Sequence, residues 1–571
     1  MDHGSGDKPQ KSQATKIVDT ALKFVSLFHD TDSIGYARVK NGSHFETHKI
    51  RSKPFKNLLS NRFYQSNKST PGTQAIQDAI SNLEGKALFE SEQRNVKVRI
   101  GGDDNQVVID LGNESWQCVV LDGNGWRIEN ESPVTFKRNR GIRSLPIPVK
   151  SNEDYGIFSR FLNIKDNELP LALGWLLGAM RPTGPYPVLL IHGEQGSAKS
   201  TTSRNLRRLI DPNSANLRSS PREERDMVIT ASNSWVFALE NLSSISGWLS
   251  DALCRMATGG GFAVREHYAD DDEMIFNVQR PAMINGIEEI ATRSDLIDRS
   301  ILLNLPTIKS TNRRTEKEIE SDFEKSWGIL FGKLLDAASM AIRNLDTTEL
   351  ESPPRLADFA QWVVSGEKAF GYHGEFMDAY STNRDNINES AIEASPIGKP
   401  LKEFIEKAGT FEGNSSELLE NLNESVEEKT RNSKDWPKSP RKISGLVRRI
   451  APNLRLIGYD VEFDLPNRSF RISMQTTVAT VATVADSSIV DGTTYGREVA
   501  TVADSGDKNR SNYGAGGSDG DLHNNSCEPR LTCDSCSEPM IPAEPVNGWR
   551  NWDCPKCNEV KPIQLGAKVL F

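Results

Sequence analysis

One short stretch restricts the fold of this chain more than any other, LLIHGEQGSAKSTT at residues 189 to 202. An apolar run leads into Gly193, a glycine-containing loop follows, and Lys199 and Ser200 come next. This order matches the phosphate-binding pattern G-x-x-x-x-G-K-[ST], except that Ala198 stands where the pattern has its second glycine. The stretch predicts a strand, a phosphate loop and a helix within a parallel α/β sheet.

The loop would bind a nucleotide through backbone N–H groups at a helix N-terminus, with Lys199 on the terminal phosphates and Ser200 on Mg²⁺. We expect Ala198 to have helical dihedral angles, so that its methyl group fits without strain. The alternative is a surface turn with a chance motif. The predicted ATP-binding residues are Gly193, Glu194, Gln195, Gly196, Ser197, Ala198, Lys199, Ser200 and Thr201.

Length and charge set further limits. With 571 residues the chain is expected to hold three to five domains, and its net charge of −9 argues against an overall basic surface for nucleic acid. Contacts with DNA would therefore come from local basic patches. The N-terminus lacks the apolar core of a signal peptide, and no stretch has eighteen uninterrupted apolar residues. We expect a cytoplasmic protein without a membrane partner.

Composition and periodicity divide the chain into six segments. Residues 16 to 30 and two later stretches have helical apolar spacing, and short β-rich runs follow up to residue 150. Strands then alternate with helices, as in a parallel sheet. The predicted segments are an α+β domain (1–150), an ATPase core (151–310), a helical lid (311–395), a winged helix (396–473), a linker (474–528) and a zinc ribbon (529–571).

Three later strands carry polar residues that would complete the nucleotide site. WVFALEN ends in Glu240 and Asn241, where an acid would hold Mg²⁺ or polarise the attacking water, although a pair of acids is usual. PAMING contains Asn285, placed for the water or the γ-phosphate. Arg299 precedes a further strand and is a candidate arginine finger for a neighbouring subunit, with Arg293 in reserve. The alternatives are helix caps or turns for Glu240 and Asn285 and surface ion pairs for the arginines.

With these elements in this order, residues 151 to 473 resemble the helicase superfamily 3 branch of AAA+ ATPases, in particular phage- and plasmid-type primase-helicases of the poxvirus type. The resemblance implies a ring, expected to be a hexamer, with single-stranded DNA in its channel. It extends to TGGGFAVREHYADDDEMIFNVQRPAMING, which is similar to the family's channel hairpin. Arg265 and His267 are the matching DNA-binding candidates, although the tip at Asp270 to Asp272 is acidic and an ordinary surface hairpin is the alternative.

A basic helix and a hairpin follow the ATPase segment. The stretch SPRKISGLVRRIAPNLRLIG carries no acid, and the order of helix, helix, basic helix and hairpin is typical of a winged helix. Such a helix would enter the major groove of duplex DNA and neutralise phosphates, whereas the alternative is a solvated basic face. The predicted contacts are Arg441, Lys442, Arg448 and Arg449.

The cysteine spacing near the C-terminus predicts a zinc site. CDSC and CPKC are separated by 17 residues, and four thiolates in two such pairs bind tetrahedral Zn²⁺. The predicted ligands are Cys533, Cys536, Cys554 and Cys557. Trp549, Arg550 and Trp552 could bind nucleic acid or a partner protein, and a purely structural ribbon is the alternative.

The N-terminal segment gives the weakest signal. Asp103, Asp104 and Asp110 cluster, but we interpret them as turn residues beside strands and find no primase site among them. The whole sequence favours an ATP-dependent DNA helicase in the replication of a phage, plasmid or other mobile element. The rivals are a DNA-binding ATPase switch that does not unwind, and a non-enzymatic DNA-binding scaffold with a degenerate nucleotide site.

Overall fold

We describe a computed structural model of the chain. It covers residues 11–265, 273–286, 293–464 and 469–474, together with the short strands β19 (Ile541–Pro542), β20 (Trp549–Asp553) and β21 (Val560–Gln564). The chain divides into two compact units, Met1–Ala479 and Thr480–Phe571. In the second unit, β19, β20 and β21 form an antiparallel sheet in that order.

The N-terminal part packs three helices against a three-stranded antiparallel sheet with the order β1-β2-β3. Its elements are α1 (Gln13–Ala21), β1 (Val25–His29), β2 (Gly35–Asn41), β3 (His44–Lys49), α2 (Lys53–Asn67) and α3 (Thr73–Phe89). The helix expected over residues 16 to 30 is therefore shorter than predicted. Helix α1 ends at Ala21, and the apolar residues that follow pair with β2 and bury Val25 and Phe28.

A second antiparallel sheet follows, with the order β5-β6-β7-β8, beside a short parallel pair of β4 and β9. These strands are β4 (Val96–Lys97), β5 (Ile100–Gly102), β6 (Val107–Asp110), β7 (Cys118–Asp122), β8 (Gly125–Glu129) and β9 (Thr135–Phe136). Side chains from β5, β6 and β7 join the same hydrophobic core as residues 157 to 380. The predicted boundary near residue 150 thus runs through one shared core.

The central layer is a parallel sheet with the order β11-β14-β10-β15, which confirms the predicted α/β class. An antiparallel pair, β12 and β13, lies between β11 and β14 in sequence. The elements here are α4 (Leu169–Ala179), β10 (Val188–His192), α5 (Lys199–Ile210), α6 (Glu224–Asn233), β11 (Phe237–Leu242), α7 (Gly247–Thr258), β12 (Gly261–Arg265), β13 (Glu273–Asn277), β14 (Ala282–Gly286), α8 (Ser294–Ile297) and β15 (Ser300–Asn304).

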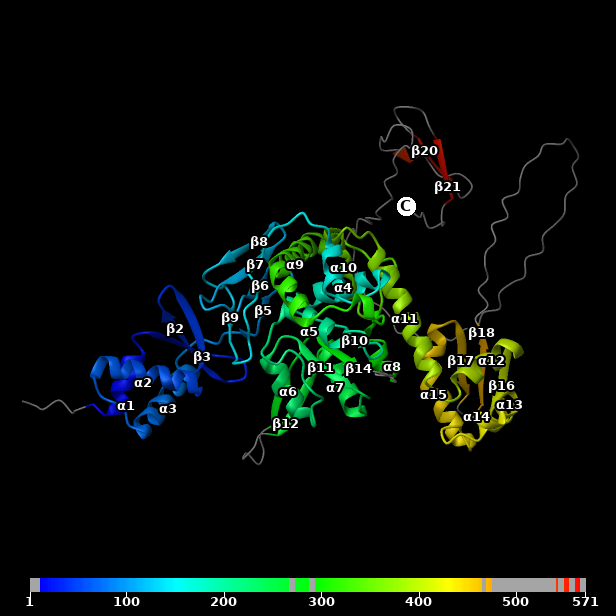
Figure 1. The fold of residues 1–571 in the computed structure, drawn as a ribbon, viewed down its shortest axis with the longest axis horizontal. Helices are drawn as coiled ribbons and strands as arrows, with labels where there is room; N and C mark the ends of the chain where they lie inside the picture. The colour runs from blue at the N-terminus through cyan, green and yellow to red at the C-terminus, as the bar shows by residue number, and fades with distance from the viewer. Residues whose placement is uncertain are drawn as a thin grey trace, which may run out of the picture. The chain divides into compact units, whose positions relative to one another are not determined.

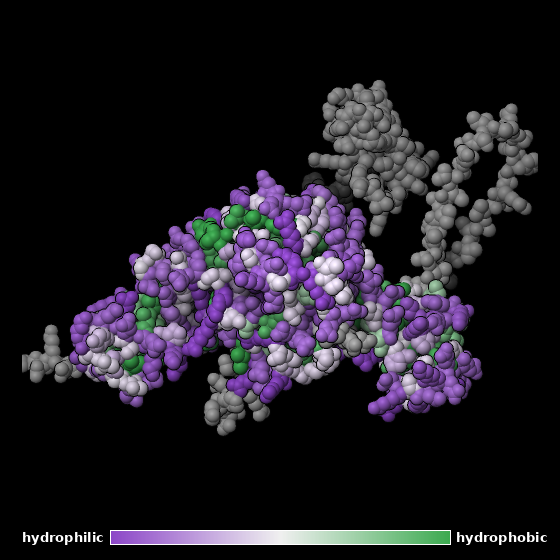
Figure 2. Space-filling model, viewed as in Figure 1, coloured by the Kyte–Doolittle hydropathy of each residue, from purple (hydrophilic) through white to green (hydrophobic). Residues whose placement is uncertain are grey.

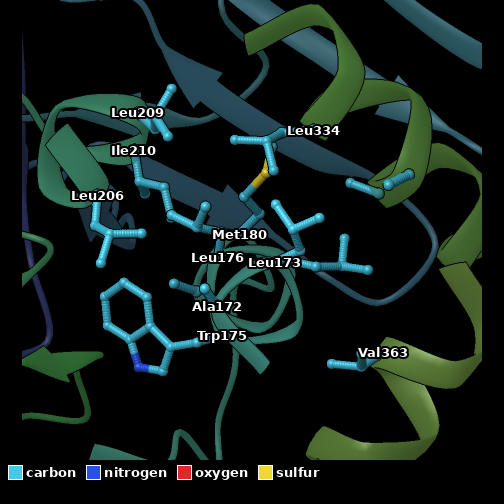
Figure 3. Close-up of a cluster of buried hydrophobic side chains, with 14 of the residues drawn as sticks. Ala172, Leu173, Trp175, Leu176, Met180, Leu206, Leu209, Ile210, Leu334 and Val363 are labelled. Carbon is cyan, nitrogen blue, oxygen red and sulfur yellow. The ribbon is translucent and has the colours of Figure 1, made fainter. Parts of the chain in front are cut away.

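Both faces of this sheet are covered, as the continuous apolar sequence of β10 requires. Leu189 and Ile191 join the core that contains α4 and α5, whereas Val188 and Leu190 join the core that contains α6 and α7. Figure 1 shows the labelled strands among these helices. Every residue of α4 is buried, and Figure 3 shows its side chains beside those of α5 and Leu334.

Three long helices follow the sheet, α9 (Glu316–Asn344), α10 (Ala357–Glu367) and α11 (Glu375–Glu393). The next part has four helices, one of them the short α14, and a sheet with the order β16-β18-β17 around its own core. Its elements are α12 (Gly398–Ala408), β16 (Thr410–Asn414), α13 (Ser415–Ser425), α14 (Glu428–Arg431), α15 (Pro440–Leu456), β17 (Tyr459–Asp464) and β18 (Ser469–Met474).

The surface is mostly polar, as the low share of hydrophobic residues in the sequence predicts. Figure 2 shows a mostly hydrophilic face, with apolar residues in small groups. Among the described helices, none combines the length and the apolar character needed to cross a membrane.

Candidate nucleotide site and nucleic-acid surfaces

The predicted phosphate loop joins two elements at the centre of the parallel sheet. Strand β10 ends at His192, helix α5 begins at Lys199, and residues 193 to 198 connect them. Strand β10 lies between β14 and β15 and is parallel to both. Because parallel strands present their carboxyl ends at one edge, the loop lies at the edge where ligands bind in open α/β sheets.

Two glycines allow the loop to fold back on itself. A Cβ atom on Gly193 would lie 2.5 Å from Oγ of Ser197 and 3.0 Å from the carbonyl oxygen of Leu305. Gly196 has a φ of +89°, which is strained for residues with a side chain. The buried Ser197 donates its hydroxyl to the carbonyl of Glu194 at 2.9 Å. The loop is therefore compact, with glycine favoured at position 193 by close contacts and at position 196 by the positive φ.

Ala198 does not have the helical angles that we expected. Its φ of 58° and ψ of 31° place it in the left-handed region, immediately before the first residue of α5. The Cβ atom of an L-residue in this region approaches the following carbonyl, which costs about 1–2 kcal/mol. The glycine of the motif serves this backbone conformation, so Ala198 is a strained substitution and the expectation of an unstrained fit is corrected.

Replacing Ala198 by glycine should therefore stabilise the protein. We expect Ala198→Gly to raise the free energy of unfolding by about 0.5–1 kcal/mol, because relief of strain exceeds the extra chain entropy of glycine. Thermal and urea denaturation of the two proteins would measure this difference. A loss of about 1 kcal/mol, as for alanine to glycine inside a helix, would contradict the left-handed assignment.

The side chain of Lys199, the first residue of α5, folds back onto the loop. Its Nζ atom donates to the carbonyl oxygens of Gly193 and Glu194, the latter at 2.9 Å. Partial burial lowers the pKa of the Lys199 amine below its ordinary value. Ser200 is exposed at the start of α5, and Thr201 is half-buried beside it. The Lys199 amine thus donates to carbonyl oxygens, and the oxygens of a bound phosphate could replace these carbonyls as acceptors.

Asn285 connects the end of β11 to α5. On β14 it is paired in register with Ile191 of β10, and it is only 2 % exposed. Its Oδ1 atom accepts the backbone N–H of Asn241 at 2.8 Å, and its Nδ2 atom donates to Oγ of Ser203 at 2.9 Å. The side chain therefore orients the neighbouring strand end and the helix, and its predicted contact with water or phosphate stays a prediction.

Glu240 and Asn241 lie at the same edge, on β11. Glu240 is half-buried, and Asn241 is exposed with a φ of 56°. The pairing of β11 with β14 is irregular between Leu239 and Leu242, which marks a bulge at these two residues. Asparagine tolerates the left-handed backbone better than most residues. The local backbone therefore gives a physical reason for asparagine at position 241.

Both candidate arginine fingers have partners within their own chain. Arg299 donates Nη1 to the carbonyl of Asp295 at 2.7 Å, and its side chain is 16 % exposed. Arg293 forms an ion pair with Asp251 at 2.8 Å and also donates to the carbonyl of Gly247, and its side chain is 38 % exposed. Arg293 is thus the more accessible of the two.

Asn163 is a residue of this region that the sequence did not indicate. Its Nδ2 atom donates to the carbonyl of Ser197 at 2.9 Å and to the carbonyl of Pro306 at 2.7 Å. The amide thereby joins the phosphate loop to the segment after β15. No local motif surrounds Asn163, since its partners lie 34 and 143 residues away in the sequence.

The hairpin candidates are described only in part. Arg265 is the last residue of β12 and pairs in register with Glu273 of β13. His267 and the acidic tip lie outside the described residues. The structure thus supplies the antiparallel pair that the sequence predicted, and the DNA contacts of Arg265 and His267 stay predictions.

Helix α15 presents one basic face. Ile443, Val447 and Ile450 are buried on its other face in the core of this part of the chain. Within the described part of the chain the four predicted DNA contacts form no ion pair; they are the exposed residues Arg441, Lys442, Arg448 and Arg449. Within the described residues, no ion pair therefore competes with phosphate for these four side chains.

The remaining predicted residues divide into two groups. Asp103 accepts two backbone N–H groups of its turn, as expected, whereas Asp104 and Asp110 form ion pairs with Arg181 and Arg138. The four cysteines lie outside the described residues, and of Trp549, Arg550 and Trp552 only the backbone in β20 is described. Zinc binding stays a prediction.

Comparison with known proteins agrees with a replication role. Residues 158–390 match the family of actinomycete integrative conjugative element replication proteins, and residues 397–487 match the C-terminal domain of the same replication protein family. Over these residues the chain is similar to a replication protein of a mobile element. No curated protein matches the chain.

Solved structures add a remote likeness. Two apo structures of the NrS-1 C-terminal region align at 11 % and 12 % identity, each with a TM-score of 0.36. Each alignment covers 82 % of this chain and 100 % of the other chain.

Proposed function

We propose that this chain is a DNA-dependent ATPase that acts as a helicase in replicating a mobile element, and that it works as an oligomeric ring, a hexamer by its resemblance to superfamily 3. One observation carries the proposal. The loop with Lys199 lies at the end of the central parallel strand, and Glu240 and Asn285 lie at the same edge of the sheet. A phosphate loop with an acid at the same edge of the sheet, here on β11 and separated from β10 by β14, is an arrangement that ATP hydrolysis can use.

The residues present fit a nucleoside triphosphate. Gly193 has no room for a Cβ atom, so the backbone closes tightly around the position where N–H groups would face phosphate oxygens. Lys199 would exchange the carbonyls of Gly193 and Glu194 for phosphate oxygens, and the exposed Ser200 hydroxyl would face Mg²⁺. Bound Mg²⁺ and ATP supply a phosphoanhydride bond polarised for attack by water.

Hydrolysis then depends on residues from several elements. We propose that Glu240 orients the Mg²⁺ or the attacking water, while Asn285 holds the end of β11 through the N–H of Asn241. An arginine of the adjacent subunit would stabilise charge on the transferred phosphoryl group. Arg299 would first have to release the carbonyl of Asp295, and the more exposed Arg293 is the second candidate.

Two surfaces are proposed for DNA. The pair β12 and β13, with Arg265 and His267, would follow single-stranded DNA in the channel. The part with α12 to α15 and the sheet β16-β18-β17 has the element order of a winged helix, with the short α14 added before α15. The unpaired basic face of α15 supports duplex binding, because phosphate contacts are made by cations free of competing acids.

The zinc proposal has its own test. We expect one Zn²⁺ per chain, bound by Cys533, Cys536, Cys554 and Cys557, and loss of the metal in the double variant Cys554→Ser, Cys557→Ser. Inductively coupled plasma mass spectrometry of purified protein measures the stoichiometry. Cys254→Ser is the control, since Cys254 is a free thiol in α7 and should retain full zinc content. Equal zinc in all three proteins would contradict the assignment.

A forked DNA substrate tests the functional proposal against its rivals. We expect ATP-dependent strand separation, measured by release of a fluorescent strand. ATP hydrolysis on DNA without strand separation would favour a switch. If neither hydrolysis nor strand separation occurred, the protein would be a DNA-binding scaffold. The strained Ala198 and the missing acid at Asn241 would then explain the lack of hydrolysis.

A further inference from the structure

The segment after β15 packs directly against the phosphate loop. The N–H of Leu305 donates to the carbonyl of His192 at 2.9 Å, and the hydroxyl of Thr307 donates to Oε2 of Glu194 at 3.2 Å. The N–H of Ile308 approaches the carbonyl of Gly196 at 3.4 Å. These contacts hold residues 305 to 308 beside the loop.

Arg313 reaches the loop from this segment. A Cβ atom on Gly196 would lie 3.5 Å from Nη2 of Arg313, and among the described residues other than the two neighbours of Gly196 in the chain no other atom lies within 4 Å. Arg313 is exposed and precedes Thr315, the N-cap of α9, by two residues. Its guanidinium therefore lies beside Gly196 of the phosphate loop.

The acids around Arg313 already have other partners. Glu194 accepts the hydroxyl of Thr307, and Glu316 forms an ion pair with Arg204 at 3.1 Å. The neighbouring Arg314 is paired with Asp322. Within the described chain, the guanidinium of Arg313 forms neither an ion pair nor a hydrogen bond. A cation left without an anion beside a phosphate loop is suited to a phosphate, which guanidinium binds in a bidentate manner.

We infer that Arg313 contacts the terminal phosphate of a nucleoside triphosphate bound to its own chain, opposite Lys199. This inference rests on the proposed ATP site and adds a second cation, supplied in cis. It also provides a connection to α9, because Arg313 lies just before the N-cap Thr315 of that helix. A diphosphate lacks the terminal phosphate, so only a triphosphate would make this contact. The presence of the terminal phosphate would thereby be sensed next to the first turn of α9.

The test compares nucleotide affinities of Arg313→Ala and Arg314→Ala, measured with fluorescent ATP and ADP analogues. We expect Arg313→Ala to lose about 10-fold or more in ATP affinity, with ADP affinity changed much less, as loss of one charge-assisted contact predicts. Arg314→Ala should bind both nucleotides like the unchanged protein. An unaltered ATP to ADP ratio in Arg313→Ala would overturn the inference, whereas absence of nucleotide binding in the unchanged protein would overturn the ATP site itself.

Mixing variants separates a residue in cis from one in trans. Chains with Lys199→Ala and chains with Arg313→Ala each lack part of the same site, so their mixture should stay at the low hydrolysis rate of Arg313→Ala alone. A mixture of Lys199→Ala with a variant of the trans arginine should instead recover activity, since some sites are then complete. Recovery in the Arg313→Ala mixture would overturn the assignment in cis.

Discussion

Replacing Lys199 by alanine is expected to reduce ATP hydrolysis by at least about 100-fold, because the transferred phosphate loses the cation that stabilises its charge. The fold should be retained. Among the described residues the amine of Lys199 donates to the carbonyls of Gly193 and Glu194 and to no carboxylate, so its removal leaves no buried charge there without a partner. Phosphate release at saturating ATP, with and without DNA, measures the effect.

Arg314→Ala serves as the matched control for Lys199→Ala. It removes the cation next to Arg313 in sequence, which is paired with Asp322, so hydrolysis should stay within about twofold of the unchanged protein. Circular dichroism and thermal denaturation would show that both variants are folded. Full turnover by Lys199→Ala would refute the assignment of this loop as the ATP site.

Neutralising the basic face of α15 is expected to weaken duplex DNA binding roughly 100-fold at moderate salt. The variant replaces Arg441, Lys442, Arg448 and Arg449 by alanine. Each phosphate contact contributes about 0.9 to the slope of log K against log salt, so the slope should fall by about 3 to 4. Buried Ile443 and Val447 are unchanged, and the domain core should therefore stay intact.

Removal of two cations from another helix is the control for this experiment. Lys399 and Lys407 are exposed on α12, and their replacement by alanine should leave the salt slope nearly unchanged. Fluorescence anisotropy at several salt concentrations measures both variants. Equal losses in the two variants would mean that general charge, rather than the face of α15, attracts DNA.

The parallel sheet could be predicted because its signals are local. Four short apolar strands alternate with helices, and the motif around Lys199 fixes which strand precedes the loop. The first hairpin could not be predicted in this way. Val25–His29 is too short for its period to separate strand from helix, and its pairing with β2 depends on a tertiary contact.

The site shows the same division between local and tertiary information. The position of Ala198 in the motif already implied a glycine-like backbone, so its positive φ could have been predicted from the pattern alone. Asn163 and Arg313 could not, because each meets the phosphate loop through a fold contact more than 30 residues away in sequence. The internal partners of Arg299 and Arg293 were likewise visible only in the structure.

The most direct test of the central proposal is DNA-stimulated ATP hydrolysis measured together with particle mass on the same sample. We expect hydrolysis to rise when single-stranded DNA is added and the mass to correspond to a multimer of the 63.4 kDa chain in the presence of ATP. A particle that stays monomeric and does not hydrolyse ATP with DNA would contradict the account.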